Sequence, residues 1–192
     1  MKSKILTIDK LEQVLIKKRS KKKIVLCHGV FDLLHVGHIK HFQEAKENGD
    51  ILVVSITPDV FVQKGPGRPA FKQKLRIEAV AALNVVDYVI LNTTPTAIKL
   101  INKIRPNIYC KGPDYRDNKR DITGQIKNEI KAVKKIGGKI IYTSGQTFSS
   151  SKLINNFDNY RSKSQKILIK KIKKKYSFLK IKSLVEKFKK LK

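Results

Sequence analysis

Short apolar runs alternate with longer amphipathic stretches along most of the chain, and this alternation predicts the α/β class. The run Ile51–Ile56 is continuously apolar, which indicates a strand buried on both faces. The remaining runs are equally short and lie between turn residues. We therefore predict five strands, at residues 23–27, 51–56, 87–91, 107–110 and 139–142.

Helical periodicity fills the segments between these runs. Thr7 or Asp9 can cap the first helix, and glycines at residues 49 and 137 stop later ones. A series of strand–helix–strand units builds a parallel sheet with helices on both of its faces. The expected helices cover residues 5–18, 36–47, 71–83, 95–104, 124–136 and 149–157.

The pattern changes after about residue 159. Residues 163–175 and 177–192 are rich in lysine and carry apolar residues at helical spacing, which indicates one or two amphipathic helices outside the sheet. We expect a sheet domain over residues 1–158, with a leading helix within residues 1–20. A lysine-rich helical extension or connector is expected over residues 159–192.

The net charge of the chain is +28, from 43 Lys and Arg residues against 15 Asp and Glu residues. This excess suggests nucleic acid or an anionic surface as a partner. Most of the basic residues are lysine, however, which is weaker than arginine in bidentate recognition. Residues 161–192 alone hold 14 basic residues and one acid, Glu186. We do not expect nucleic acid as the main partner, and nucleic-acid or partner binding by the tail stays the alternative.

Cys27 and Cys110 both end predicted strands. We interpret them as small buried residues in a reducing cytoplasm, because neither has a second ligand at metal-binding spacing. No metal ligand is therefore expected among the protein side chains. No apolar run approaches the roughly 18 residues of a membrane span, and the basic start lacks the apolar core of a secretory signal. A cytoplasmic location is the expectation.

The segment 29–38 reads G-V-F-D-L-L-H-V-G-H and lies where the first strand passes into the next helix. His35 and His38 share one face of the helix start, where free N–H groups and the helix dipole favour phosphate. Phe31 is expected to pack beneath the loop, and Asp32 to orient the loop or a histidine.

Three more polar segments follow predicted strands, at residues 57–70, 111–123 and 143–149. Ligands of open α/β sheets bind beyond the carboxyl ends of the strands, so these loops should converge on one cleft with the histidines. His28 can line that cleft, whereas His41 is expected only to pack or to face solvent. The serines at residues 149–151 can cap a helix or bind a phosphate oxygen.

The segment 29–38 resembles the signature of the cytidylyltransferase-like superfamily of nucleotidyltransferases, which carry an H-x-G-H motif. Further elements follow in the family's order: K-G-P-G-R-P at residues 64–69, an arginine ahead of L-N-V-V-D, K-G-P-D-Y at residues 111–115, and the serine run. The K-G-P-D-Y element favours the sugar-phosphate branch. The likeness covers about residues 7–157 and is greatest to the heptose-1-phosphate adenylyltransferase domain that accompanies ribokinase-type sugar kinases.

The resemblance implies a Rossmann-like enzyme that joins a nucleoside monophosphate from ATP or CTP to a sugar phosphate, heptose 1-phosphate, and releases pyrophosphate. His35, His38 and Lys64 would be catalytic, and Arg68 would contact the substrate phosphate. Mg²⁺ would arrive with the triphosphate, held by phosphate oxygens and water. A homodimer and a fused or separate sugar kinase are also implied. The implied nucleotide-binding residues are Gly29, Val30, Phe31, Asp32, Gly37, Arg76, Lys111, Gly112, Asp114, Ser149, Ser150 and Ser151.

Two alternatives remain at this point. One is a glycerol-3-phosphate-type cytidylyltransferase, which shares the H-x-G-H motif. The other is a basic protein that binds nucleic acid or a partner through residues 159–192. Neither the base nor the acceptor is determined by the residues above.

Overall fold

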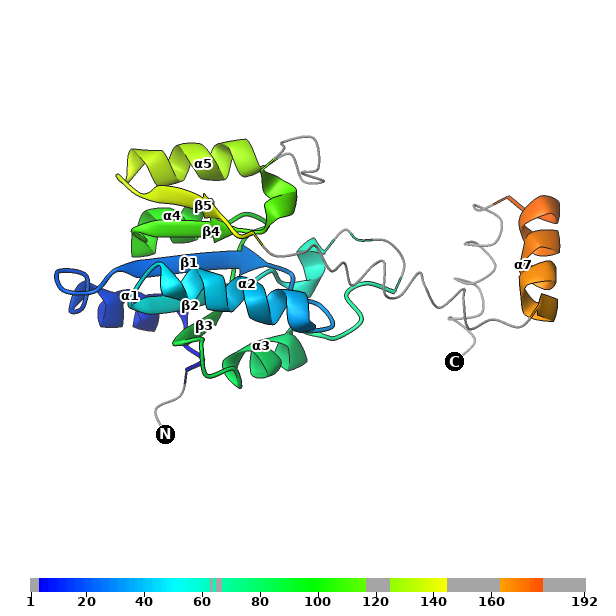
Figure 1. The fold of residues 1–192 in the computed structure, drawn as a ribbon, viewed down its shortest axis with the longest axis horizontal. Coiled ribbons are helices and arrows are strands. Elements are labelled where there is room, and N and C mark those ends of the chain that lie inside the picture. The colour runs from blue at the N-terminus through cyan, green and yellow to red at the C-terminus, as the bar shows by residue number, and fades with distance from the viewer. Residues whose placement is uncertain (1–3, 63, 65–66, 117–124, 145–162, 178–192) are drawn as a thin grey trace. The chain divides into compact units, whose positions relative to one another are not determined.

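Five parallel strands form the sheet of this computed structural model (Figure 1). Their order is β3-β2-β1-β4-β5, so the first strand lies in the middle of the sheet and the chain winds outward to both sides. The five predicted strands and their parallel arrangement are confirmed. The strands are β1 (Ile24–Gly29), β2 (Ile51–Ile56), β3 (Tyr88–Leu91), β4 (Ile108–Lys111) and β5 (Lys139–Tyr142).

The structure describes residues 4–62, 64, 67–116, 125–144 and 163–177. The chain divides into two compact units, Met1–Ser150 and Ser151–Lys192. In the second unit the described helix is α7 (Lys163–Lys175), over the residues where the first tail helix is expected. The predicted domain boundary, the helix at residues 149–157 and nearly all of the second tail helix lie outside the described residues and stay predictions.

Helices cover both faces of the sheet, as the alternation of strands and helices predicts (Figure 1). One apolar cluster joins α1, α4 and α5 to residues such as Ile24 and Leu26 of β1. The other joins α2 and α3 to Val25 and Cys27, which point to the opposite face. The helices are α1 (Ile8–Ile16), α2 (Val36–Glu47), α3 (Gln73–Ala81), α4 (Ile98–Ile104) and α5 (Ile126–Lys135), with short 3₁₀ turns η1 (Asp59–Phe61) and η2 (Pro113–Tyr115).

Four helices begin two or three residues later than their sequence patterns predict: α1 at Ile8, α3, α4, and α5 at Ile126. The structure gives the reason for α3 and α4. α3 begins at Gln73 instead of residue 71, because the Asp32 carboxylate accepts the N–H groups of Ala70 and Phe71 and holds them in a loop. α4 begins at Ile98 instead of residue 95. There the Asn92 amide donates to the carbonyls of residues 94 and 96, which closes a loop before the helix. In both cases a side chain outside the helix binds the backbone groups just before it: Asp32 acts from the loop after β1, and Asn92 acts from within the same loop.

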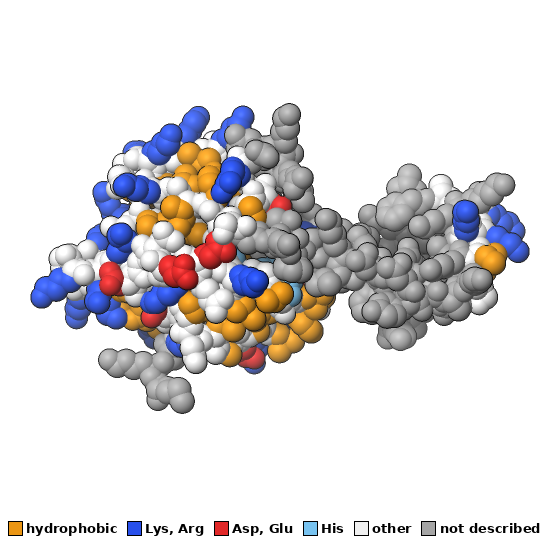
Figure 2. Space-filling view, viewed as in Figure 1, with side chains coloured by type: hydrophobic (Ala, Val, Ile, Leu, Met, Phe, Trp, Pro, Cys, Tyr) orange, Lys and Arg blue, Asp and Glu red, His pale blue; other side chains and the backbone are white. Residues whose placement is uncertain are grey.

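Figure 2 shows Lys and Arg side chains spread over the visible face, with Asp and Glu side chains among them, instead of one basic patch. Among the residues that the structure describes, no helix combines the length and apolar composition needed to cross a membrane.

Glu129 of α5 forms a buried polar bridge between α4 and the sheet. Its carboxylate accepts from the Ala97 N–H at 2.9 Å and from the Tyr109 hydroxyl at 2.8 Å, and it lies 3.6 Å from Lys111 Nζ. Glu129 and Lys111 are both buried, at 5% exposed each. The carboxylate therefore satisfies a helix start and a buried ammonium at the same time.

We predict that Glu129→Ala lowers the free energy of unfolding by about 3–5 kcal/mol, because it leaves the buried Lys111 charge unpaired. Urea unfolding followed by circular dichroism measures this. The matched control is Glu47→Ala at an exposed position of α2, expected to change stability by less than about 0.5 kcal/mol. Equal stability of the two variants would contradict the bridging role.

Candidate active site

The loops that leave the carboxyl ends of β1, β2 and β4 carry the described candidate residues. β1 lies between β2 and β4, and its last residue, Gly29, is in register with Ile56 of β2. The loop after β1 holds the H-x-G-H motif, and the loop after β2 holds Lys64 and Arg68. The sheet thus brings together segments that are far apart in the sequence.

His35 and His38 stack on each other at the start of α2. Their ring centroids are 3.8 Å apart and their planes differ by 20°. His35 is the N-cap of α2, and its Nδ1 accepts the N–H of Gly37 at 3.1 Å. Because Nδ1 accepts, the proton of a neutral His35 lies on Nε2. The cap therefore selects the tautomer whose Nε2–H can donate to a ligand.

The ring of Phe31 packs against the ring of His38. The two rings meet edge to face, with centroids 5.4 Å apart and an interplanar angle of 82°. Phe31 has a left-handed backbone, with φ of 47°, and its side chain belongs to the apolar cluster under α2. A Cβ at position 29 would lie 3.1 Å from the Phe31 ring. Gly29 is therefore needed for the packing of this ring.

Both histidines of the motif are held neutral. Burial, followed by the charges of His35, His41 and Lys64, lowers the pKa of His38 to about 3, while Asp32 acts in the opposite direction. Burial and then Lys64 lower the pKa of His35. Each imidazole therefore offers one N–H donor near pH 7 without adding a positive charge.

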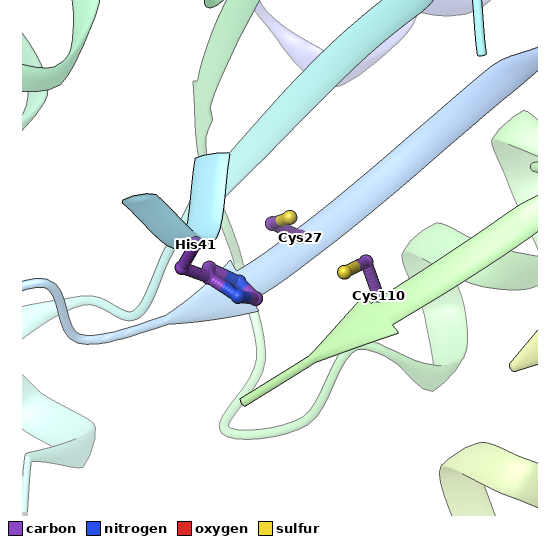
Figure 3. Close-up of side chains that lie close together, drawn as sticks. All are labelled: Cys27, His41 and Cys110. Atoms are coloured by element: carbon purple, nitrogen blue, oxygen red, sulfur yellow. The ribbon is translucent and has the colours of Figure 1, made fainter. Parts of the chain in front are cut away.

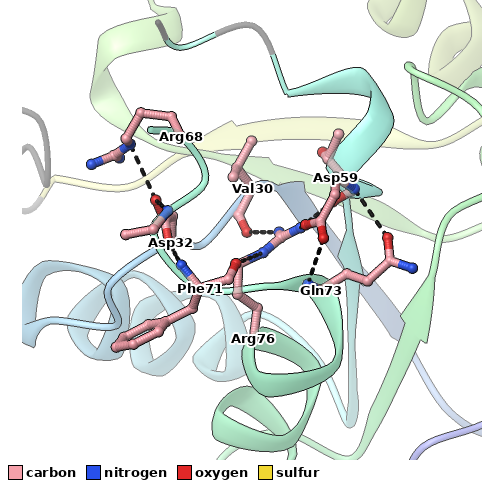
Figure 4. Close-up of polar contacts among 9 residues, drawn as sticks. Val30, Asp32, Asp59, Arg68, Phe71, Gln73 and Arg76 are labelled. Carbon is pink, nitrogen blue, oxygen red and sulfur yellow. Dashed lines mark hydrogen bonds and ion pairs between the residues drawn. The ribbon is translucent and has the colours of Figure 1, made fainter. Parts of the chain in front are cut away.

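Lys64 and Arg68 bring cationic side chains to these imidazoles. Burial, and then the neighbouring charge of Arg68, lowers the pKa of Lys64. The Arg68 side chain is 8% exposed, and its Nε lies 3.1 Å from Asp32 Oδ2 (Figure 4). Its buried Nη1 and Nη2 have no hydrogen-bond partner among the residues that the structure describes. Such a guanidinium is suited to an anion that accepts from both nitrogens.

Asp32 and Arg76 organise the loops and do not open onto the site. Asp32 is 2% exposed and accepts from Ala70 and Phe71, as the orienting role proposed for it requires. Arg76, which the sequence pattern assigns to nucleotide binding, is instead 1% exposed and bound to protein acceptors (Figure 4). It donates to the carbonyls of Phe71, Val30 and Thr57 and to the Asp59 carboxylate. These contacts occupy four of its five N–H groups, so it positions the loops.

Lys111 also points into the protein. Its Nζ lies 4.1 Å from the centroid of the Tyr115 ring and 3.6 Å from Glu129, in addition to contacts with the His28 carbonyl and the Tyr109 hydroxyl. Gly112 is open on the side where a Cβ would lie, and Asp114 is in the turn η2. The predicted Ser149, Ser150 and Ser151 lie outside the described residues, so their part in the site stays a prediction.

Sequence reasoning missed two groups that the site depends on. Asp59 pairs with Arg76 at 2.7 Å, and its carboxylate and N–H exchange hydrogen bonds with Gln73 at the start of α3. Its place directly after a strand and a proline could have marked it. Glu129 lies in the middle of an ordinary amphipathic helix, and no local pattern distinguishes it from a surface glutamate.

The carboxylate of Asp32, which acts on the site, is occupied by contacts within the protein. Asp32 influences both His38 and Lys64, but its two oxygens accept from backbone N–H groups and pair with Arg68. It is therefore not available as a ligand for a hard cation such as Mg²⁺.

Comparisons with known proteins agree with this arrangement. The family described as cytidylyltransferase-like matches residues 26–177. The bifunctional protein HldE of Campylobacter concisus is 38% identical over 138 residues, which are 71% of this chain and 29% of that protein. The bifunctional protein HldE of Helicobacter pylori is 41% identical over 132 residues, 68% of this chain and 28% of that protein. This chain spans less than a third of the length of these relatives.

Two solved structures share the fold. The lipopolysaccharide core biosynthesis protein from Thermoplasma volcanium superposes with a TM-score of 0.55 and 29% identity, over 66% of this chain and 99% of that one. A pantoate-β-alanine ligase from Francisella tularensis gives a TM-score of 0.54 at 19% identity, over 76% of this chain and 68% of that one. At that identity the second likeness concerns the fold alone.

The buried neutral state of His38 predicts a pH-dependent stability. Its pKa is about 3 in the folded protein, against about 6.5 when unfolded, so only the unfolded chain takes up this proton between pH 6 and 5. The stability that His38 contributes is therefore fully present above pH 6.5, and it is lost as the pH falls toward the pKa of His38 in the folded protein. Between pH 6 and 5 we expect the free energy of unfolding of the wild type to fall, relative to that of His38→Gln, by at most about 1.4 kcal/mol per pH unit. Urea unfolding at several pH values measures it, and parallel stability curves would argue against a neutral buried His38.

Proposed function

Because the chain belongs to the cytidylyltransferase-like family, we propose that it transfers a nucleoside monophosphate from ATP to a sugar phosphate, heptose 1-phosphate. The products are pyrophosphate and a nucleotide-activated sugar. CTP remains the alternative nucleotide, and glycerol 3-phosphate the alternative acceptor. The adenylyl and heptose parts of the proposal rest on the likeness to the HldE proteins and on the K-G-P-D-Y element.

One observation carries the proposal: two neutral, stacked imidazoles lie at the start of a helix, where the charge of Lys64 acts on both of them and Arg68 is paired with Asp32. His35 and His38 supply N–H donors, and Lys64 and Arg68 supply positive charge. A helix start adds free backbone N–H groups. An anion with several charged oxygens, such as a triphosphate, balances the charge of this set.

The chemistry needs no nucleophile from the protein. An oxygen of the sugar phosphate attacks the α-phosphorus in line, and the bond from that phosphorus to the bridging oxygen of the leaving pyrophosphate breaks. Negative charge then grows on the pyrophosphate, where His35 Nε2–H, His38 and Lys64 stabilise it. Donors that are already fixed in place by the helix cap and by Phe31 require no reorganisation at that moment.

We assign the phosphate of the acceptor to Arg68. Its Nη1 and Nη2 are buried and have no partner in the described part of the chain, while Asp32 fixes the guanidinium through Nε. A phosphate monoester presents two oxygens at the spacing that a guanidinium accepts. The acceptor would then lie beside the α-phosphorus, opposite the pyrophosphate that the histidines and Lys64 stabilise.

Nucleotidyltransferases generally use their triphosphate together with a divalent metal ion, and we propose Mg²⁺. Asp32 is committed to Arg68 and to two backbone N–H groups, so the described residues around the histidines do not provide a carboxylate ligand. We therefore assign the ion to the phosphate oxygens and water.

The setting of the reaction is proposed from its substrates. A sugar 1-phosphate requires a kinase that phosphorylates the sugar, and we propose a ribokinase-type kinase, fused or separate, as its source. The HldE relatives are described as bifunctional, which supports this pairing. We further propose a homodimer and a cytoplasmic location, where ATP is supplied.

We predict that His35→Ala and His38→Ala each lower kcat by about 10²-fold or more, because each removes a donor to the leaving group. The assay is pyrophosphate release from ATP, CTP, GTP and UTP against heptose, hexose and polyol phosphates. Lys74→Ala, at an exposed lysine of α3, is the control and should keep full activity. No release with any pair of substrates, or normal kcat in the double histidine variant, would refute the proposed transfer.

Arg68→Gln is expected to raise the KM of the sugar phosphate on the order of 10- to 100-fold, since it removes charge-assisted hydrogen bonds. The KM of ATP should change much less. Steady-state kinetics with each substrate varied in turn separates the two effects. If the KM of ATP alone rises, Arg68 binds the triphosphate instead of the acceptor.

A further inference from the structure

Three side chains with metal-binding atoms meet beneath α2, outside the phosphate-binding set. Cys27 comes from β1, Cys110 from β4 and His41 from α2, and Figure 3 shows the three pointing toward one another. One ligand atom of each lies within 4.8 Å of those of the other two. The sequence predicts no such site because the third ligand comes from a helix on one face of the sheet, far from both strand ends in the chain.

The two cysteines are held side by side by the sheet itself. Cys27 and Cys110 are register partners of adjacent parallel strands, and both are free thiols with 0% exposure. Neighbouring strands lie about 4.8 Å apart, and side chains of paired residues leave the same face. The two sulfur atoms are therefore preorganised by the backbone on the face that α2 covers.

His41 is oriented as a metal-binding histidine usually is. Its Nδ1 lies 3.1 Å from the hydroxyl of Thr143, a residue that is 4% exposed at the end of β5. A proton on Nδ1 that is donated to this hydroxyl leaves the lone pair on Nε2 for a ligand. Metal-bound histidines commonly donate their other N–H to an oxygen in this way. Burial, and then the charge of Lys111, lowers the pKa of His41 to about 4, so the ring is neutral.

The donor set suits a soft ion with filled d orbitals. Two thiolates and one imidazole bind Zn²⁺ or Cu⁺ in preference to Mg²⁺ or Ca²⁺. With bonds of about 2.3 Å to sulfur and about 2.0 Å to nitrogen, two ligand atoms on one ion are roughly 3.5–4 Å apart. Since the observed distances do not exceed 4.8 Å, each pair of ligand atoms would have to approach by at most about 1.3 Å.

The net charge of the three side chains with a bound ion would be small. Zn²⁺ with two thiolates is neutral, and Cu⁺ with two thiolates carries one negative charge. Burial, and then the neighbouring Cys110, raises the pKa of the Cys27 thiol, while the charge of Lys111 acts in the opposite direction. The bound ion must therefore supply most of the stabilisation of the thiolate form. Both thiols lose their protons on binding, so one ion entering releases two protons to solvent.

We propose that Cys27, Cys110 and His41 form a binding site for a thiophilic cation, Zn²⁺ or Cu⁺. The bound ion links α2 to β1 and β4. His38 precedes His41 by three residues on the same helix. The ion would thus anchor the helix that carries the phosphate-binding histidines.

The test uses the full chain without an affinity tag, in a phosphine reductant. Zn²⁺ binding is tested by adding Co²⁺, whose thiolate complex has a charge-transfer absorption, and then displacing the Co²⁺ with Zn²⁺. Cu⁺ binding is tested by competition with a Cu⁺-specific chelator. We expect saturation at about one ion per chain and release of two protons per Zn²⁺. Cys27→Ala, Cys110→Ala and His41→Leu should lose tight binding. Thr143→Val should weaken it about 10- to 100-fold.

Two controls separate this site from the rest of the protein. His28→Asn replaces a buried histidine that bonds to Ser55, and the double variant His35→Ala/His38→Ala removes the other histidine pair. Both should keep the thiolate absorption. Absence of thiolate absorption and of Cu⁺ binding in the wild type would overturn the proposal. Tight binding that survives in folded Cys110→Ala protein, or wild-type affinity in folded Thr143→Val protein, both checked by circular dichroism, would do the same. Pyrophosphate release is measured separately, so failure here leaves the proposed transfer untouched.

Discussion

The guanidinium of Arg76 is the contact on which the geometry of the site depends. It joins the loop after β1, through Val30, to the loop after β2, through Thr57 and Asp59, and it does so at the start of α3. Removing one partner of a buried ion pair typically lowers the free energy of unfolding by about 3–5 kcal/mol, because the charge of the other partner is left uncompensated. The loops that carry the histidines and the phosphate-binding cations are thus set by a residue that itself faces the protein interior.

Within that frame, the site concentrates donors while limiting its charge. Burial keeps His35 and His38 neutral, and Asp32 offsets part of the charge of Arg68. The remaining positive potential comes from Lys64 and from the unpartnered end of Arg68 in the described part of the chain. Such a site is complementary to a polyanion whose charge is redistributed during the proposed reaction. Neutral N–H donors can bind the charge that develops in the transition state without binding the ground state strongly.

Much of the fold could be predicted because its signals are local. Apolar runs marked every strand, and turn residues marked most ends, so the strand order along the chain and the parallel sheet followed. The starts of α3 and α4 could not be predicted from periodicity, since Asp32 and Asn92 capture backbone groups there. The H-x-G-H segment was equally local: its spacing alone placed two imidazoles on one helix face.

The sequence by itself determined the parallel α/β sheet, and it predicts phosphate binding by residues 29–38, because both signals depend on neighbours within a few positions. Only the tertiary structure decided which cations face the site. It turned Arg76 and Lys111 inward, toward carbonyls, Asp59 and Glu129. It paired Arg68 with Asp32 and left the outer nitrogens of Arg68 without a partner in the described part of the chain. The cluster of Cys27, Cys110 and His41 likewise arises from strand pairing and helix packing. Whether a charged side chain binds a ligand or the protein depends on acceptors brought by distant segments, and no local pattern records them.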